Sequence, residues 1–170
     1  TPGILIDGDV LTAVVEGSQL NAGSSANVVK SHVVMRGDTD VTANYRFADY
    51  VDGKLTVTPR KVLMTSGSDE KVYDGAPLTK DEVTVTGDGF IEGEGATYDV
   101  TGSQLDVGSS DNTFTYELNE GTLTDNYIIE AEEGELTVTC PEQHIVITAN
   151  SAEKTYDGTP LTDDGCTYTD

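Results

Sequence analysis

The chain has no tryptophan, only two cysteines, two histidines and two methionines, and only nine lysines and arginines among 170 residues. Against 31 acidic residues, this shortage of basic ones gives a formal net charge of −22. Such a charge repels phosphate backbones and anionic lipid headgroups, so the sequence disfavours nucleic acid and membrane surfaces as partners. We expect most of the acid to keep the surface solvated, with Ca²⁺ or a cationic partner as the alternative.

The few cysteines exclude the common zinc sites. Cys140 and Cys166 form no Cys-x-x-Cys or Cys/His spacing that would hold zinc. A disulfide between them would close a loop of about 26 residues and would stabilise the fold by about 3 kcal/mol in the chain-entropy model. Two free, buried thiols fit the sequence equally well, so both states remain open.

Recognisable catalytic and cofactor motifs are missing too. His32 and His144 lie 112 residues apart, and no Ser, Cys or carboxylate stands at a catalytic spacing from either. The Gly-Ser-Gln-Leu sequences are not the Gly-x-Ser-x-Gly of a nucleophile elbow, and no acidic cluster has the order of an EF-hand or an RTX repeat. We predict a protein that is not an enzyme and needs no cofactor, with Ca²⁺ at an acidic turn such as 37–40 as the alternative.

Targeting signals and membrane spans are also missing from the sequence. No apolar run is long enough to cross a membrane, and neither a signal peptide nor an anchor motif is visible. Because the repeats described next begin and end within a repeat, we expect the chain to belong to a longer protein that carries its targeting segments elsewhere.

The sequence does contain internal repeats. Lys-Val-Tyr-Asp-Gly-Ala-Pro-Leu-Thr at 71–79 returns as Lys-Thr-Tyr-Asp-Gly-Thr-Pro-Leu-Thr at 154–162, a step of 83 residues. Gly-Ser-Gln-Leu followed by Gly-Ser-Ser occurs at 17–25 and again at 102–110, and Asn-Tyr occurs at 44–45 and 126–127. Signatures in one order with nearly one period predict a tandem array of one folding unit. We expect residues 1–60 to be a partial repeat that lacks its first strands, 61–140 a complete repeat, and 141–170 the start of a third.

Helical periodicity is absent, and short runs alternate apolar with polar residues between glycines, aspartates and asparagines, which is typical of an all-β chain. We predict tandem small Ig-like β-sandwich repeats. Residues 108–112 are expected to form a polar turn, and 132–134 a tight hairpin between the last two strands. Proline after each repeat, at positions 59 and 141, is expected to stiffen the junctions. The strands predicted in the complete repeat are 61–65, 83–87, 96–102, 113–118, 126–131 and 135–139.

The combined pattern resembles the MBG/YDG-type repeat modules of bacterial cell-surface proteins. The resemblance is carried by Lys71-x-Tyr-Asp-Gly-x-x-Leu-Thr, then by Gly-Thr-Leu at 121–123, Asn-Tyr at 126–127 and Gly-Glu-Leu-Thr-Val-Thr at 134–139. Residues 1–60 lack the Tyr-Asp-Gly segment. Membership implies large, extracellular, often wall-attached proteins with adhesin-like layouts, and it implies no shared catalytic site.

The motif residues at the two Tyr-Asp-Gly turns are Tyr73, Asp74, Gly75, Tyr156, Asp157 and Gly158. We interpret them as structural. The tyrosines are expected to pack over the end of a small sandwich, and the aspartates to cap their own turns through backbone N–H groups. The less favoured alternatives are a ligand contact for the tyrosines, a metal contact for the aspartates, and isopeptide bonds from Lys71 and Lys154, which would need burial and a neutral carboxylic acid nearby.

These observations predict a non-catalytic stalk, spacer or adhesion segment of an extracellular bacterial surface protein. The expected partners are neighbouring repeats of the same parent protein. The alternative is a module that binds host glycan or protein through the loops at 87–95 and 108–112. Residues 1–60 and 141–170 together amount to about one repeat, so the chain is expected to be either a monomer or a head-to-tail oligomer in which strands of one molecule complete another.

Overall fold

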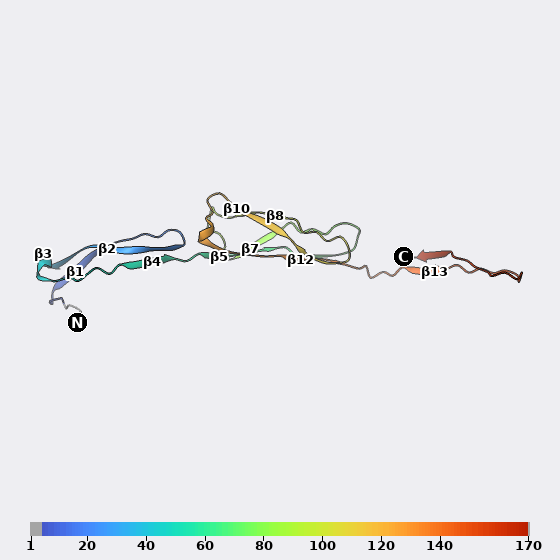
Figure 1. The fold of residues 1–170 in the computed structure, drawn as a ribbon, viewed down its shortest axis with the longest axis horizontal. Helices are drawn as coiled ribbons and strands as arrows, with labels where there is room; N and C mark the ends of the chain where they lie inside the picture. Colours follow the sequence, from blue (N-terminus) through green and yellow to red (C-terminus); the bar gives the residue numbers. More distant parts are fainter. Residues whose placement is uncertain (1–4, 170) are drawn as a thin grey trace. The chain divides into compact units, whose positions relative to one another are not determined.

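The protein is described here by a computed structural model of residues 5–169, which form β-strands and turns with no α-helix among them (Figure 1). The predicted all-β class is therefore confirmed, as several small sheets. Within these residues no helix is long and apolar enough to cross a membrane. The elements are β1 (Asp9–Glu16), β2 (Gly23–Arg36), β3 (Thr39–Asp40), η1 (Thr42–Asn44), β4 (Gly53–Val57), β5 (Arg60–Ser66), β6 (Asp69–Val72), β7 (Val83–Gly87), β8 (Ala96–Val100), β9 (Gly108–Asn112), β10 (Phe114–Leu118), η2 (Thr124–Asn126), β11 (Tyr127–Glu132), β12 (Gly134–Thr139), β13 (Val146–Ala149) and β14 (Cys166–Thr169), where η denotes a 3-10 turn.

The chain divides into two compact units. The first comprises Thr1–Met64, Val85–Tyr98 and Tyr116–Glu132, and the second comprises Thr65–Thr84, Asp99–Thr115 and Glu133–Asp170. The boundaries of the units follow contacts between distant segments, whereas the sequence repeats follow the order of the chain, so the two divisions differ.

In the first unit, the long strand β2 pairs with three others. It is antiparallel to β1, to β3 and, through residues 23–27, to β4. A β-bulge between Val14 and Val15 shifts the register of β1 against β2, and the side chain of Val34 is fully buried. Strand β4 pairs only with β2 among the described strands, so its other edge presents unpaired backbone groups.

In the second unit, β12 is the middle strand of a three-stranded sheet. It runs parallel to β6 on one edge and antiparallel to β9 on the other. Leu136 and Val138 alternate with threonines along β12 and are buried together with Leu78, which lies in the loop after the Tyr-Asp-Gly turn. Alternation of apolar and polar side chains thus places one face of β12 in the core, as the period of a strand requires.

Residues 60–72 contribute to two different sheets. Strand β5 lies between β11 and β7, whereas β6, two residues further on, is an edge strand beside β12. The change occurs at Gly67, whose N–H donates to Glu82 O at 2.9 Å. A Cβ atom at Gly67 would lie 2.7 Å from Lys80 Cγ, so glycine allows the close approach. On β5, Val62 and Met64 are buried, which matches alternation along the strand.

The last part of the second unit is the antiparallel pair of β13 and β14. Val146 pairs with Thr169, and Ala149 pairs with Cys166. Every residue of both strands is exposed. Apolar side chains such as Ile147 therefore lie in solvent, although they alternate as core residues of a strand would.

The strand predictions fit the structure except at two places. Residues 108–112 were expected to be a polar turn but form β9, because serines and an aspartate are accommodated on an edge strand when backbone pairing with β12 holds them. The hairpin expected at 132–134 is also wrong. Strands β11 and β12 flank Glu133 but belong to different sheets, and β12 pairs with β6 and β9 instead. The segment at 69–72, β6, was missed because it is short and polar.

Candidate functional site

The first Tyr-Asp-Gly turn is held by a hydrogen-bonded lysine–aspartate pair. Lys71 Nζ donates to Asp74 Oδ1 at 2.6 Å and to Ala76 O at 2.6 Å, and Ala76 N–H donates to the same Asp74 oxygen at 3.0 Å. These donors, with Lys71 first, hold the pKa of Asp74 below its usual value. Gly75 has φ of +80°, a conformation that favours glycine. The geometry stabilises the turn and keeps Asp74 ionised.

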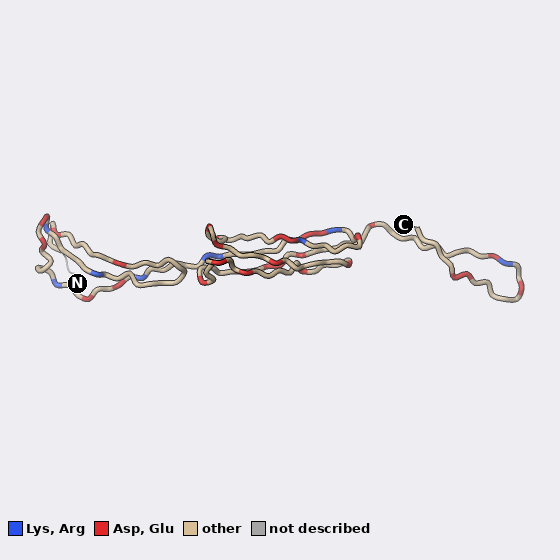
Figure 2. The backbone as a smooth tube through the Cα atoms, turned by 90° about the horizontal axis from the view of Figure 1, so that it is seen from above, with Lys and Arg blue, Asp and Glu red and all other residues tan. Residues whose placement is uncertain are grey.

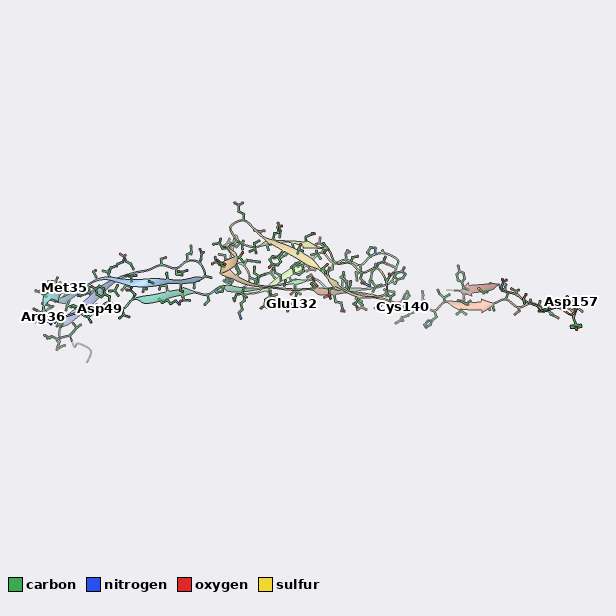
Figure 3. The ribbon with its side chains drawn as sticks, viewed as in Figure 1. Met35, Arg36, Asp49, Glu132, Cys140 and Asp157 are labelled. Carbon is green, nitrogen blue, oxygen red and sulfur yellow. The ribbon has the colours of Figure 1, made fainter. Side chains whose placement is uncertain are left out.

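The second turn repeats this arrangement. Lys154 Nζ donates to Asp157 Oδ1 at 2.8 Å, Thr159 N–H donates to the same oxygen at 2.9 Å, and Gly158 has φ of +75°. The pKa of Asp157 is lowered by the same causes in the same order, Lys154 and then Thr159. Asp157 lies in the connection between β13 and β14 (Figure 3).

The two tyrosines of the motif differ in their surroundings. Tyr73 N–H donates to Thr139 O at 2.8 Å and so extends the pairing of β6 with β12. Its ring is 43% exposed, whereas Tyr156 is 92% exposed. The same sequence motif therefore contacts a sheet edge at one position and lies in solvent at the other.

Asn112, at the end of β9, is fully buried and links three segments. Its Nδ2 atom donates to Gly67 O and to Lys80 O, both at 2.8 Å. Ser66 Oγ donates to Asn112 O at 2.6 Å and accepts from Gly134 N–H at 2.8 Å. This network ties the turn between β5 and β6 to the starts of β12 and β7.

Glycine makes room for this asparagine. A Cβ atom at Gly102 would lie 2.2 Å from Asn112 Oδ1 and 2.5 Å from Asn112 Cα. The same relation recurs 85 residues earlier, where a Cβ atom at Gly17 would lie 2.7 Å from Asn27 Oδ1. The Gly-Ser-Gln-Leu signature is therefore explained by packing against an asparagine that it always precedes by ten residues.

A buried tyrosine anchors the loop after β7. Tyr127 OH donates to Glu94 Oε2 at 2.7 Å and accepts from Ile91 N–H at 3.3 Å, and the ring of Phe90 lies 5.0 Å from that of Tyr127. Burial, followed by the Glu94 hydrogen bond, raises the pKa of Tyr127. The loop at 87–95 is thereby fixed to the start of β11.

Tyr45 makes the equivalent contacts in the first repeat. Its hydroxyl donates to Asp9 Oδ2 at 2.5 Å and accepts from Ile6 N–H at 3.0 Å. Arg36 adds a bidentate pair to Asp9, with Nε to Oδ1 at 2.6 Å and Nη2 to Oδ2 at 2.9 Å. Arg36, then Tyr45, lowers the pKa of Asp9, whose side chain is fully buried. Figure 3 shows Arg36 near the end of β2.

An exposed aromatic group lies on the first repeat. The ring of His32 lies 3.7 Å from that of Phe47, and His32 Nδ1 is hydrogen-bonded to Tyr50 OH at 2.6 Å. Phe47 and Tyr50 are both exposed. This group can offer a flat apolar face with polar edges to a ligand.

The two cysteines, Cys140 and Cys166, are exposed and unbonded in the structure. Cys140 immediately follows β12, and Cys166 begins β14 (Figure 3). Their exposure disagrees with the alternative of two buried thiols, and a disulfide between them stays a prediction.

No constellation for chemistry is visible in the part of the chain that the structure describes. There, no three His, Cys, Asp or Glu side chains converge as metal ligands would. The acidic residues are spread along the chain, as the red positions in Figure 2 show. Lys71 and Lys154 pair with exposed aspartates three residues away, an arrangement without the buried carboxylic acid that isopeptide chemistry needs.

The sequence reasoning missed Asn112, Tyr127, Asp9 and Arg36. For Asn112 and Tyr127 a signal was available, because Asn27 and Tyr45 hold the same places in the preceding repeat. For Asp9 and Arg36 there was none, because their pairing depends on the register of β1 against β2, in which they stand opposite one another. No protein-family model, no curated protein and no solved structure matches the chain.

Proposed function

We propose that the chain is a non-catalytic tandem array of small Ig-like β-sandwiches that serves as a stalk, spacer or adhesion segment of an extracellular bacterial surface protein. The observation that carries the proposal is the recurrence of whole hydrogen-bond sets at the repeat spacing. Gln19 Nε2 donates to Asn21 O at 2.7 Å, and Gln104 Nε2 donates to Asp106 O at 2.8 Å, 85 residues later. A chain that rebuilds the same local contacts is built for repetition of a unit.

Strand register recurs as well. Residues 23–27 pair with β4 so that Ser25 stands opposite Leu55, and residues 108–112 pair with β12 so that Ser110 stands opposite Leu136. The sandwich interpretation rests on the segment 60–72, because a continuous strand that leaves one sheet for another ties two sheets together around one core. The first strand of this unit then runs parallel to its last strand, β12.

A spacing role is supported by the contacts around the first junction. Ala22 N–H donates to Asn126 Oδ1 at 2.7 Å, and Asn126 Nδ2 donates to Asn21 Oδ1 at 3.2 Å, within the first unit. Only Thr58 and Pro59 separate β4 from β5. A short linker with proline restricts the angles that neighbouring repeats can adopt. The partners proposed for such a segment are neighbouring repeats of the same parent protein.

Small-angle scattering of the whole chain tests the spacing role. Extended, jointed repeats give a maximum dimension well above that of a compact globule of the same mass, and lengthening the 58–59 linker with a flexible Gly-Ser insert broadens the distance distribution. The matched control places the same insert in the loop at 88–89, inside a repeat. A profile of one compact particle for the unaltered chain would sink the proposal.

Ligand binding is the second candidate, favoured by the His32, Phe47 and Tyr50 group. Of the two loops first considered for binding, 108–112 is now a strand within a sheet and is no longer available as a loop. A glycan array probed with the chain, and with a Tyr50→Ala variant, tests this function. Binding that the variant loses by tenfold or more would favour adhesion over spacing, and Tyr116→Ala on β10 serves as the exposed-aromatic control.

A further inference from the structure

The open edge of β4 has the form of a docking site. In the second unit the corresponding strand, β12, is covered on that edge by β6 in parallel register, with Val138 opposite Lys71 and Thr139 opposite Val72. Strand β4 carries the same Leu-Thr-Val-Thr sequence at 55–58 and pairs with β2 in the register that β12 uses with β9. The chain thus contains its own template for what covers such an edge.

The direction of the backbone groups on this edge follows from the template. Glu135 N–H donates to Ser68 Oγ at 3.0 Å, and Thr139 O accepts from Tyr73 N–H at 2.8 Å. Odd-numbered residues of β12 therefore point their backbone groups toward β6, since these groups alternate along a strand. On β4 the equivalent residues are Lys54, Thr56 and Thr58, whose positions follow by subtracting 81.

Residues 145–169 present the matching part. Asn150 N–H donates to Gly165 O at 3.0 Å, as Gly67 N–H does to Glu82 O at 2.9 Å, so the pair of β13 and β14 has already formed the turn geometry of β5 and β7. The apolar side chains that would be buried are waiting in solvent. Against equivalents that are 2%, 0% and 7% exposed (Val62, Met64 and Leu78), Ile145, Ile147 and Leu161 are 67%, 70% and 48% exposed.

We infer that residues 145–169 of a second copy of this chain dock on the open edge of β4. By the template, Lys154 of one copy stands opposite Val57 of the other, and Leu161 pairs with Gln19 as Leu78 pairs with Gln104. Asn27 then donates to the backbone of the incoming turn, as Asn112 does to Gly67 and Lys80. This inference goes beyond the proposed function, because a spacer needs no edge that captures another molecule.

One position predicts that the docked copy is held less firmly than the covalent one. Ala149 stands where β5 has Ser66, so the hydroxyl that bridges Asn112 O and Gly134 N–H has no counterpart. The contact is also heterologous, because the edge of one copy meets the tail of the next. It therefore generates chains of molecules whose length grows with concentration.

Sedimentation equilibrium of the whole chain tests the inference, at raised salt to screen repulsion between acidic surfaces. The average mass is expected to rise with concentration beyond that of two chains. Thr56→Pro removes one N–H from the open edge while leaving the pairing of β4 with β2, since proline is tolerated on an edge strand whose N–H faces outward. Leu161→Asp places a charge on the tail at a residue that is exposed in the single chain. Each variant alone is expected to be monomeric.

Mixing the two variants gives the decisive measurement. Each supplies the half that the other lacks, so the mixture is expected to form dimers and nothing larger. Backbone hydrogen exchange in residues 23–27 reports that β2 still pairs with β4 in Thr56→Pro. A concentration-independent monomer for the unaltered chain would overturn the inference, as would association that survives both substitutions or a mixture that stays monomeric. None of these outcomes would alter the scattering test of the spacing role.

Discussion

Residues 60–139 and the segments on either side carry the same signatures and differ in how much of each they bury. Leu136 and Met64 are fully buried, whereas the equivalent Leu55 is half-buried and Ile147 is 70% exposed. Local features do not differ in this way. The lysine–aspartate turns, the Gln-to-backbone bonds and the tyrosine–carboxylate bonds form in both copies. Turn geometry is thus set locally, whereas burial depends on a complete set of strands.

The region after η1 shows the same dependence. Residues 45–50 are equivalent to β11, yet they form no strand. In the complete repeat β11 pairs with β5, and no strand equivalent to β5 lies beside residues 45–50 among those described. Backbone groups of an extended segment need a neighbour to form a ladder, so sequence similarity alone does not produce the strand.

The largest expected effect is at the core leucines. Leu136→Ala leaves a cavity at a fully buried site and is expected to cost about 2–5 kcal/mol of unfolding free energy. Leu55→Ala, the same substitution at the matching register position, is expected to cost less than half as much because its side chain already contacts solvent. Urea denaturation followed by tyrosine fluorescence measures both. Equal costs would break the comparison between complete and incomplete repeats.

The next effect concerns the buried asparagine. Asn112→Ala leaves the carbonyls of Gly67 and Lys80 without their donor and is expected to cost about 1–3 kcal/mol. Asn27→Ala is the control, because Asn27 is only half-buried, and it is expected to cost about 0.5 kcal/mol or less. Thermal unfolding of the two variants measures the difference. A larger loss at Asn27 would contradict the proposed role of the network.

A pH experiment sharpens the comparison on the first repeat. The folded-state pKa of Asp9 lies below the ordinary value of 3.8, so its pairing with Arg36 contributes full stability above that pH and loses it as pH falls through the folded pKa. Asp9→Asn is expected to flatten the acid dependence of hydrogen exchange in β1 and β2. Exchange in β6 and β12, which lie far from Asp9 in sequence, is the internal control. Unchanged acid dependence in β1 would refute the assignment.

The smallest effect is expected at the junction. Asn126→Ala removes the acceptor of Ala22 N–H, so exchange of the Ala22 amide should quicken several-fold while the unfolding midpoint stays unchanged within error. Asp125→Ala, on the neighbouring exposed position of η2, is the control and should leave that amide unaffected. Slow exchange in Asn126→Ala would mean that another group protects Ala22.

Much of the complete repeat was predictable from the sequence, because alternation of apolar residues and threonine marks strands such as β7 and β12. Polar strands were not. Residues 108–112 contain no apolar side chain and were predicted as a turn, and 69–72 drew no prediction. Both are strands only because β12 lies between them and supplies ladder partners on each edge.

The candidate site divides in the same way. The Tyr-Asp-Gly turns were located from the motif, since an aspartate followed by a glycine of positive φ closes such a turn using neighbours three to five residues away. Asn112 with Gly102, and Asp9 with Arg36, join residues that are distant in sequence or set by strand register. Their contacts depend on where other strands pass.

By itself the sequence determined the period of the repeat, the all-β class and the geometry of the Lys-x-Tyr-Asp-Gly turns, because each depends on residues within a few positions of one another. Only the tertiary structure decided which copy of each apolar residue is buried and which sheet edge is left open. Burial and ladder pairing are relations between distant segments, so identical local sequences reach different states when different strands stand beside them.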